Sequence, residues 1–130
     1  MEIFEDLSRR ERQIMEIIYR KGSATASEVQ SELGENINYS TVRALLRILE
    51  EKGHLHHETS GNKYIYHPIV PRQNAVQSVV SNLLDTFFES SVEQAIAALI
   101  EIKKDDLNND QLNRLARMIE EARKEEKDNV

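Results

Sequence analysis

The sequence has no cysteine, and this absence removes several kinds of chemistry. A chain of 130 residues without cysteine has no disulfide bond, no thiolate metal ligand and no thiol nucleophile. Its four glycines form no glycine-rich phosphate-binding loop, and we find neither a metal-ligand spacing nor a nucleophile motif. These absences argue against an enzyme and against a bound metal or cofactor.

Long hydrophobic runs are also missing. No apolar segment approaches the length of a membrane-spanning helix, and the N-terminal residues MEIFEDLS lack the basic and apolar regions of a signal peptide. The mean hydropathy of −0.58 agrees with a soluble chain. We therefore expect a cytoplasmic protein that does not insert into a membrane, with one ordinary domain or two small ones.

Positive charge is scarce, which at first argues against a nucleic-acid partner: the net charge is −6. Its distribution is uneven, since residues 1–72 carry 10 Lys and Arg against 11 Asp and Glu, whereas residues 73–130 carry 7 against 12. The first segment is therefore nearly neutral and can hold a local cationic patch. The residues of this patch are Arg43, Arg47, Lys52 and Lys63. Because the patch is small, binding to DNA should depend strongly on salt and on two binding units per complex.

The most informative pattern lies in residues 38–68. Apolar residues recur at helical spacing at Val42, Leu45, Leu46 and Leu49, so one face of a helix must be buried. The opposite face carries small, polar or cationic groups that can enter a DNA groove. These are Ser40, Arg43, Ala44 and Arg47.

A glycine-tipped hairpin follows this helix. Lys52-Gly53 is a typical helix end, and residues 55–59 and 64–67 have the composition of two strands around the turn Ser60-Gly61-Asn62-Lys63. A groove-facing helix followed directly by a hairpin is typical of a winged helix. We therefore predict a recognition helix and a wing.

Capping signals predict two further helices before the recognition helix. Ser8 to Glu11 and Thr25 to Glu28 each have the spacing of a capping box. The loop after Gly34 leads into the recognition helix, with Asn38 or Ser40 as its N-cap. Two short helices joined by such a turn form a helix-turn-helix.

From Pro71 onward the pattern is purely helical. Capping signals begin new helices at Ser91 and Asn108. The apolar residues of this half are too many for three short helices to bury alone, so we predict that two copies share them. The predicted dimerisation residues are Val76, Val80, Leu83, Leu84, Phe87, Phe88, Ile96, Leu99, Leu112, Leu115 and Ile119. The fold class is thus mainly α with a small β-hairpin, as a winged-helix DNA-binding domain in residues 1–72 and a helical dimerisation domain in residues 73–130.

The chemistry of individual side chains gives them expected roles on DNA. Arg43 can donate two parallel hydrogen bonds to guanine, which contributes about 1–3 kcal/mol of base discrimination. Arg47, one turn further on, is placed to meet a phosphate. On the wing, Asn62 and Lys63 should approach the neighbouring backbone or minor groove, and Arg10 on the first helix is a weaker phosphate candidate.

These segments together resemble the penicillinase and methicillin-resistance repressor family, also called BlaI/MecI/CopY. The resemblance rests on LSRRERQIMEIIYRKGSATASEVQSELG, YSTVRALLRILEEKGHL, YHPIV and LLDTFFESSVEQAIAALI. It implies a homodimeric bacterial transcriptional repressor that binds palindromic operator DNA. It also implies that Thr41 and Arg43 occupy the base-contacting positions, with Ser40 beside them at the groove.

The family resemblance further implies a membrane sensor protease that leads to cleavage of the repressor, commonly at an Asn-Phe bond. The corresponding residues 95–108 contain no Asn-Phe bond, and the Gly of the family's helix break is Ser90 or Ser91 here. Cleavage at that bond is therefore excluded. The copper-responsive branch uses cysteine motifs, which this chain lacks.

Three alternatives stand beside these expectations. Tyr39, Tyr64 and Tyr66 could stack on sugars, but packing in the core is favoured. His56 and His57 suggest a metal site, yet strand alternation sends them to opposite faces, so no metal is expected. The alternative function is a winged-helix module that docks on proteins without specific DNA binding, as the acidic net charge allows.

Overall fold

The computed structural model describes residues 4–34 and 36–128, and the chain divides into two compact units, Met1–Leu83 and Leu84–Val130. The division falls inside helix α4 (Arg72–Phe87). The predicted domain boundary between residues 72 and 73 lies at the start of this helix and stays a prediction.

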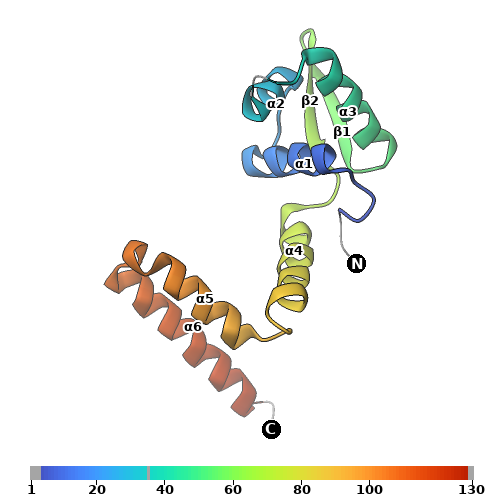
Figure 1. Cartoon of the computed structure of the whole chain (residues 1–130). Helices are drawn as coiled ribbons and strands as arrows, with labels where there is room; N and C mark the ends of the chain where they lie inside the picture. Colours follow the sequence, from blue (N-terminus) through green and yellow to red (C-terminus); the bar gives the residue numbers. More distant parts are fainter. Residues whose placement is uncertain (1–3, 35, 129–130) are drawn as a thin grey trace. The chain divides into compact units, whose positions relative to one another are not determined.

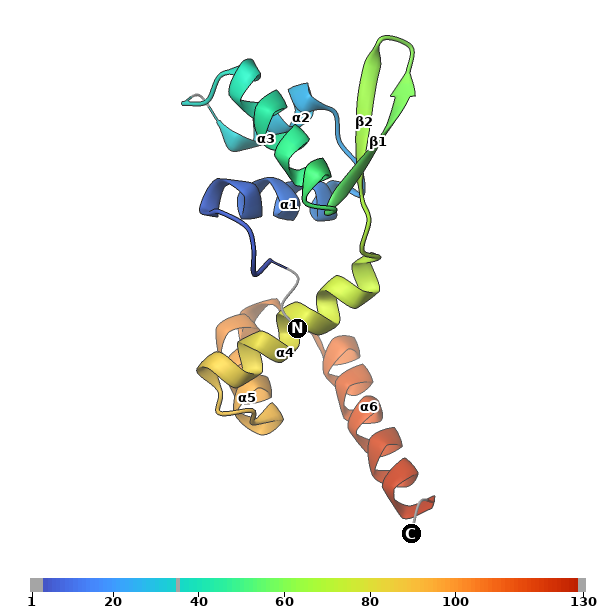
Figure 2. The same ribbon diagram turned by 90° about the vertical axis from the view of Figure 1, so that its right-hand side faces the viewer.

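Three helices with capped ends open the first unit (Figures 1 and 2). They are α1 (Arg9–Lys21), α2 (Ala26–Leu33) and α3 (Tyr39–Glu51). The predicted caps are confirmed: the Ser8 hydroxyl accepts from the Glu11 backbone N–H, and Thr25 forms a complete capping box with Glu28. These side chains satisfy backbone donors that have no partner within a helix.

The end of α3 is fixed by a glycine in a left-handed conformation. Gly53 has a φ of +85°, which costs a residue without Cβ little. The His54 backbone N–H donates to the Leu49 carbonyl and the Gly53 N–H to the Glu50 carbonyl. This pair of bonds is the Schellman motif. It turns the chain directly into the hairpin.

The hairpin consists of β1 (Leu55–Ser60) and β2 (Lys63–Pro68), paired antiparallel with Ser60 opposite Lys63. Gly61, the first loop residue, has a φ of +63°, the sign that a type II′ turn needs there. Sequence patterns did not indicate a third segment: Ala24, between α1 and α2, forms an isolated bridge with Tyr66. This bridge ties the hairpin to the helices.

One hydrophobic core joins the helices and the base of the hairpin. The predicted apolar face of α3 lies in it, since Val42, Leu46 and Leu49 are fully buried and Leu45 packs partly against them. The other fully buried large side chains of this core are Ile14, Met15, Ile18, Val29 and Leu55. The buried side of α3 is thereby fixed, and its opposite side faces solvent.

The rest of the chain is helical, as predicted. After α4 come α5 (Val92–Lys103), a short 3-10 turn η1 (Lys104–Asp106) and α6 (Asn109–Asp128). Ser91 caps α5, and Asn108 and Gln111 exchange two hydrogen bonds at the start of α6. None of the helices in the described part of the chain is long and apolar enough to cross a membrane.

Candidate nucleic-acid interface

The N-terminus of α3 orients Thr41. Asn38, one of the two expected caps, accepts hydrogen bonds at its Oδ1 from the Thr41 backbone N–H at 2.8 Å and from the Thr41 hydroxyl at 2.9 Å. Because that oxygen carries no hydrogen, the hydroxyl must be the donor. With its hydrogen used in this bond, the Thr41 hydroxyl can serve a further partner as an acceptor.

The structure brings the predicted residues of α3 together on its solvent side. Ser40, Thr41, Arg43 and Arg47 are all exposed, opposite the buried face of the helix. The Arg47 Nε lies 3.9 Å from the Glu51 carboxylate, one turn further on. An exposed pair of this length is weak, so it does not prevent Arg47 from contacting another anion.

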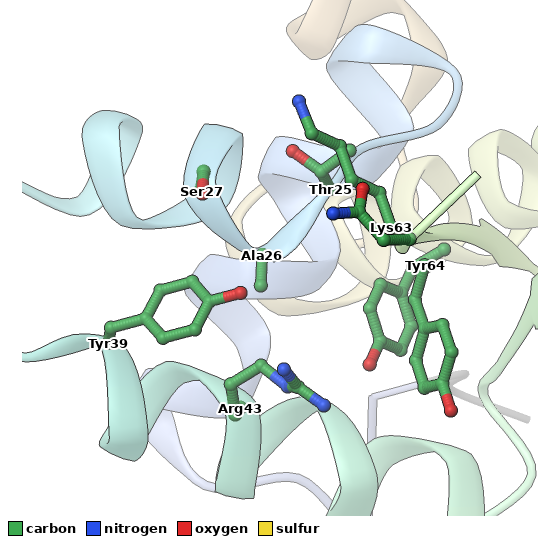
Figure 3. A pocket seen from close by; sticks show the side chains of 9 residues that line it. Thr25, Ala26, Ser27, Tyr39, Arg43, Lys63 and Tyr64 are labelled. Atoms are coloured by element: carbon green, nitrogen blue, oxygen red, sulfur yellow. The ribbon is translucent and has the colours of Figure 1, made fainter. Parts of the chain in front are cut away.

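Arg43 lies between two tyrosine rings (Figure 3). Its guanidinium carbon is 5.8 Å from the ring centre of Tyr39 and 5.6 Å from that of Tyr64, within the range of a cation–π contact. A side-chain hydrogen bond with Tyr39 raises the pKa of Arg43 above its ordinary value. Among the described residues no carboxylate pairs with Arg43, so its positive charge stays uncompensated.

Tyr64 packs against a second ring, that of His57. The His57 ring stacks on the Tyr64 ring with centroids 4.1 Å apart, and the Glu50 carboxylate bonds to His57 Nδ1. Tyr66 lies edge-on to Tyr64 at 6.4 Å and is itself buried, which raises the pKa of its hydroxyl. The rings of His57, Tyr64 and Tyr66 thus form one group of contacting aromatic side chains on the hairpin.

The expectation that all three tyrosines pack in the core is wrong for two of them. Tyr66 is buried, but Tyr39 and Tyr64 are 43% and 42% exposed. Tyr39 precedes Arg43 by one helical turn, a spacing that places two side chains together; this signal was present in the sequence. No local signal indicated Tyr64, because the hairpin brings it to Arg43 from outside the helix.

Two shallow hollows flank Arg43. The first, of about 290 Å³ (Figure 3), contains Thr25, Ala26 and Ser27 from the start of α2 together with Asn62 and Lys63 from the hairpin turn. The second, of about 460 Å³, lies between α3 and the hairpin and includes Ser40, Ala44 and Arg47. Five of the seven predicted DNA-binding residues thus line these two hollows: Ser40, Arg43, Arg47, Asn62 and Lys63. Thr41 is exposed on α3 but lies outside both linings.

Arg10 and Lys52 lie elsewhere. Arg10 is exposed on α1, where its guanidinium donates to the Gln13 side chain at 3.1 Å, and it lines neither hollow. Lys52 was expected in the cationic patch, but its ammonium group donates to the Glu11 carboxylate and to the Asp6 carbonyl, each at 2.7 Å. The patch is therefore smaller than the sequence suggested.

The wing histidines are separated by strand alternation. His56 stacks on His67 with centroids 5.2 Å apart, whereas His57 packs against Tyr64. Within residues 4–34 and 36–128 no group of three or more His, Asp or Glu side chains is arranged to hold a metal ion.

Comparison with known proteins decides the family. Residues 7–121 match the sequence profile described as "Penicillinase repressor". This chain belongs to the penicillinase repressor family. It is 24% identical over 124 residues to the penicillinase repressor of Bacillus licheniformis, a match that covers 94% of this chain and 95% of the relative. The family places the chain among DNA-binding transcriptional repressors and not among enzymes, as the sequence predicted.

Solved structures show the same winged-helix fold. The transcriptional regulator Tm0710 of Thermotoga maritima aligns with a TM-score of 0.51 and 19% identity, covering 98% of this chain and 83% of that one. FabT of Streptococcus pneumoniae, solved in complex with DNA, aligns with a TM-score of 0.51 and 18% identity, covering 98% of this chain and 81% of that one. At these identities the likeness concerns the fold alone.

Proposed function

We propose that this repressor acts as a homodimer on palindromic operator DNA, with α3 in the major groove and the β1–β2 hairpin as a wing on the adjacent backbone. The observation that carries the proposal is the single solvent-facing surface on which α3 and the hairpin turn lie together. The family's DNA-binding class supports it. The proposed place of action is the cytoplasm, where bacterial DNA is held.

The geometry supports a division of roles on this surface. Arg43 has an uncompensated guanidinium and is assigned to a guanine, whereas Arg47 and Lys63 are assigned to phosphates. Thr41 presents lone pairs and a methyl group, so it suits an amino group of adenine or cytosine, or the methyl of thymine. Ser40 is assigned to the groove beside Thr41 and Arg43. Asn62 is assigned to the adjacent backbone or minor groove, and Arg10 to a weaker phosphate contact.

The exposed apolar residues of α4, α5 and α6 support the homodimer. Phe87, Leu99 and Ile119 are 72%, 61% and 54% exposed, and no described residue of α5 or α6 is buried. Surfaces of this kind mark interaction sites in soluble proteins. A two-fold dimer would present two α3 helices to half-sites about one turn of DNA, or a multiple of it, apart.

A gel shift of the full chain with DNA from upstream of its own gene tests the proposal, with footprinting to locate the site. We expect a retarded band at low salt and a protected palindrome. Absence of any shift at low salt would remove the repressor proposal and favour a protein-docking module.

Two substitutions test the assigned roles. Arg43→Ala should relax the preference at one base pair per half-site, at a cost of about 1–3 kcal/mol for the preferred sequence. Lys63→Ala should weaken binding to all sequences alike and flatten the dependence on salt, because a phosphate contact is lost. Equal losses on every sequence for Arg43→Ala would show that Arg43 does not contact a base.

We propose, from the family resemblance, that a membrane sensor protease system is a partner of this repressor. Because the sequence contains no Asn-Phe bond, such a protease would have to act on another bond. Mass spectrometry of the repressor recovered from induced cells tests this assignment. An intact chain after induction would contradict it.

A further inference from the structure

We propose that Tyr39 and Tyr64 are positioning residues for Arg43: together they fix its guanidinium for base recognition, and Tyr64 makes that recognition depend on the wing. The inference rests on the proposed function and adds to it two residues that are not expected to contact a base themselves.

The first step is the kind of partner that Arg43 has. A carboxylate would hold an arginine by occupying its N–H groups and cancelling its charge, as Glu51 partly does for Arg47. Tyrosine rings hold Arg43 instead, at 5.8 and 5.6 Å. A ring contact at the face of a guanidinium leaves its in-plane N–H groups available to donate. The Tyr39 side chain also hydrogen-bonds to Arg43, and the remaining N–H groups are the donors that a guanine edge requires.

The second step is the cost of ordering a long side chain. A free arginine loses most of its rotamer freedom when it binds a base, up to about 2 kcal/mol on general scales, and prior ordering removes part of that loss. In this structure Tyr39 approaches from the same helix and Tyr64 from the hairpin, so Arg43 is held from two elements (Figure 3). Neither tyrosine is needed to fill the core, since both are more than two-fifths exposed.

The third step links the wing to the base. Tyr64 lies one residue from Lys63, the wing residue assigned to a phosphate, and is backed by His57 and Glu50. The contact between Tyr64 and Arg43 is present without DNA, so the hairpin itself holds Arg43 from a second side through Tyr64. A hairpin displaced from α3 would leave Arg43 held by Tyr39 alone.

Selection from a random pool of double-stranded DNA with the full chain provides the first test. The wild type should select a guanine at one position per half-site. Tyr39→Leu and Tyr64→Leu should each lower the preference for that guanine about 2- to 5-fold, the range of a cation–π contact at an exposed site. Tyr39→Phe and Tyr64→Phe, which keep the ring, should retain most of the preference. In an Arg43→Ala background the leucine substitutions should have no further effect on that base.

A measurement without DNA separates this inference from the proposed function. In NMR spectra of the free protein, the side-chain protons of Arg43 should show ring-current shifts that Arg47 lacks. Tyr64→Leu should reduce these shifts and Tyr64→Phe should preserve them. Circular dichroism melting checks that each variant is folded.

The outcomes are distinct. Suppose that the wild type selects guanine but the leucine variants weaken binding to all sequences alike, or weaken it by the same factor in the Arg43→Ala background. The tyrosines are then merely structural, and this inference fails while the proposed function stands. Arg43 shifts that equal those of Arg47 would also overturn it. If the wild type selects no sequence at all, the proposed function fails, and the positioning role fails with it.

Discussion

At the scale of single residues, Glu11 shows how the DNA-binding unit is held together. Its carboxylate is buried, with 6% of the residue exposed, and accepts from the Lys52 ammonium group at 2.7 Å. This contact links the start of α1 to the end of α3. Hydrogen bonds from Lys52, and then from Ser8, lower the pKa of Glu11 below its ordinary value of 4.5.

Lys52→Met should therefore destabilise the unit by about 1–3 kcal/mol at pH 7, because a nearly buried carboxylate loses its cation. The folded pKa of Glu11 is lowered, so its contribution to stability is present above pH 4.5 and is lost as the pH falls through the folded pKa. The variant lacks much of this contribution, and its stability should fall less steeply with acid. Urea unfolding at pH 7 and at lower pH measures both effects.

Arg47→Met is the matched control, because the exposed Arg47–Glu51 pair at 3.9 Å should contribute less than about 1 kcal/mol. Equal losses for the two variants would show that the Lys52–Glu11 contact is no more than a surface pair.

At the scale of elements, the break between α4 and α5 is made without glycine. Glu89 and Ser90 have φ values of +51° and +63°, in the left-handed region. The Ser90 backbone N–H donates to the Leu84 carbonyl at 2.9 Å, and its hydroxyl donates to Asp85 at 2.7 Å. Of the two serines considered for the helix break, Ser90 has the conformation that favours glycine, since Ser91 has a φ of −90°.

Ser90→Val should lower the free energy of unfolding by about 1–2 kcal/mol, because a β-branched side chain fits the left-handed region poorly. Ser90→Gly should be better tolerated, since it relieves backbone strain while losing the bond to Asp85. Thermal melting followed by circular dichroism compares the two. If Ser90→Val were as stable as Ser90→Gly, the backbone at residue 90 would not be strained.

Elements were predictable where their signals are local. Helix starts at Ser8, Thr25 and Ser91 follow from side chains that bond to backbone groups three residues away. The solvent face of α3 follows from the periodicity of its buried face. The bridge of Ala24 to Tyr66, the Lys52–Glu11 contact and the approach of Tyr64 to Arg43 all join residues distant in sequence, and no local pattern specifies such pairs.

At the scale of the whole molecule, the apolar surface of the C-terminal helices is the dominant feature. Ile119, Leu115 and Leu112 recur along one side of α6 and are all exposed. In a dimer that buries this side of α6, an introduced charge would be buried without a partner, and the free-energy cost of that burial would oppose association.

Ile119→Glu should therefore dissociate the proposed dimer, and DNA affinity should fall because two linked units bind together more tightly than one. Multi-angle light scattering at micromolar concentration measures the mass. Asn113→Glu, the same charge at an exposed polar position of α6, should remain dimeric. A wild-type chain that is monomeric at this concentration would refute the two-fold arrangement.

The bridge between Ala24 and Tyr66 has a consequence for motion. Each residue donates its N–H to the carbonyl of the other, at 3.1 and 2.8 Å, whereas the turn at Gly61 and Asn62 is exposed. The hairpin is therefore bonded to the helical part of the unit at Tyr66, whereas its turn lies in solvent. In a hydrogen–deuterium exchange experiment, the amide protons of Ala24 and Tyr66 should exchange only when the whole unit unfolds. The amide protons of the turn should exchange within the dead time of the measurement.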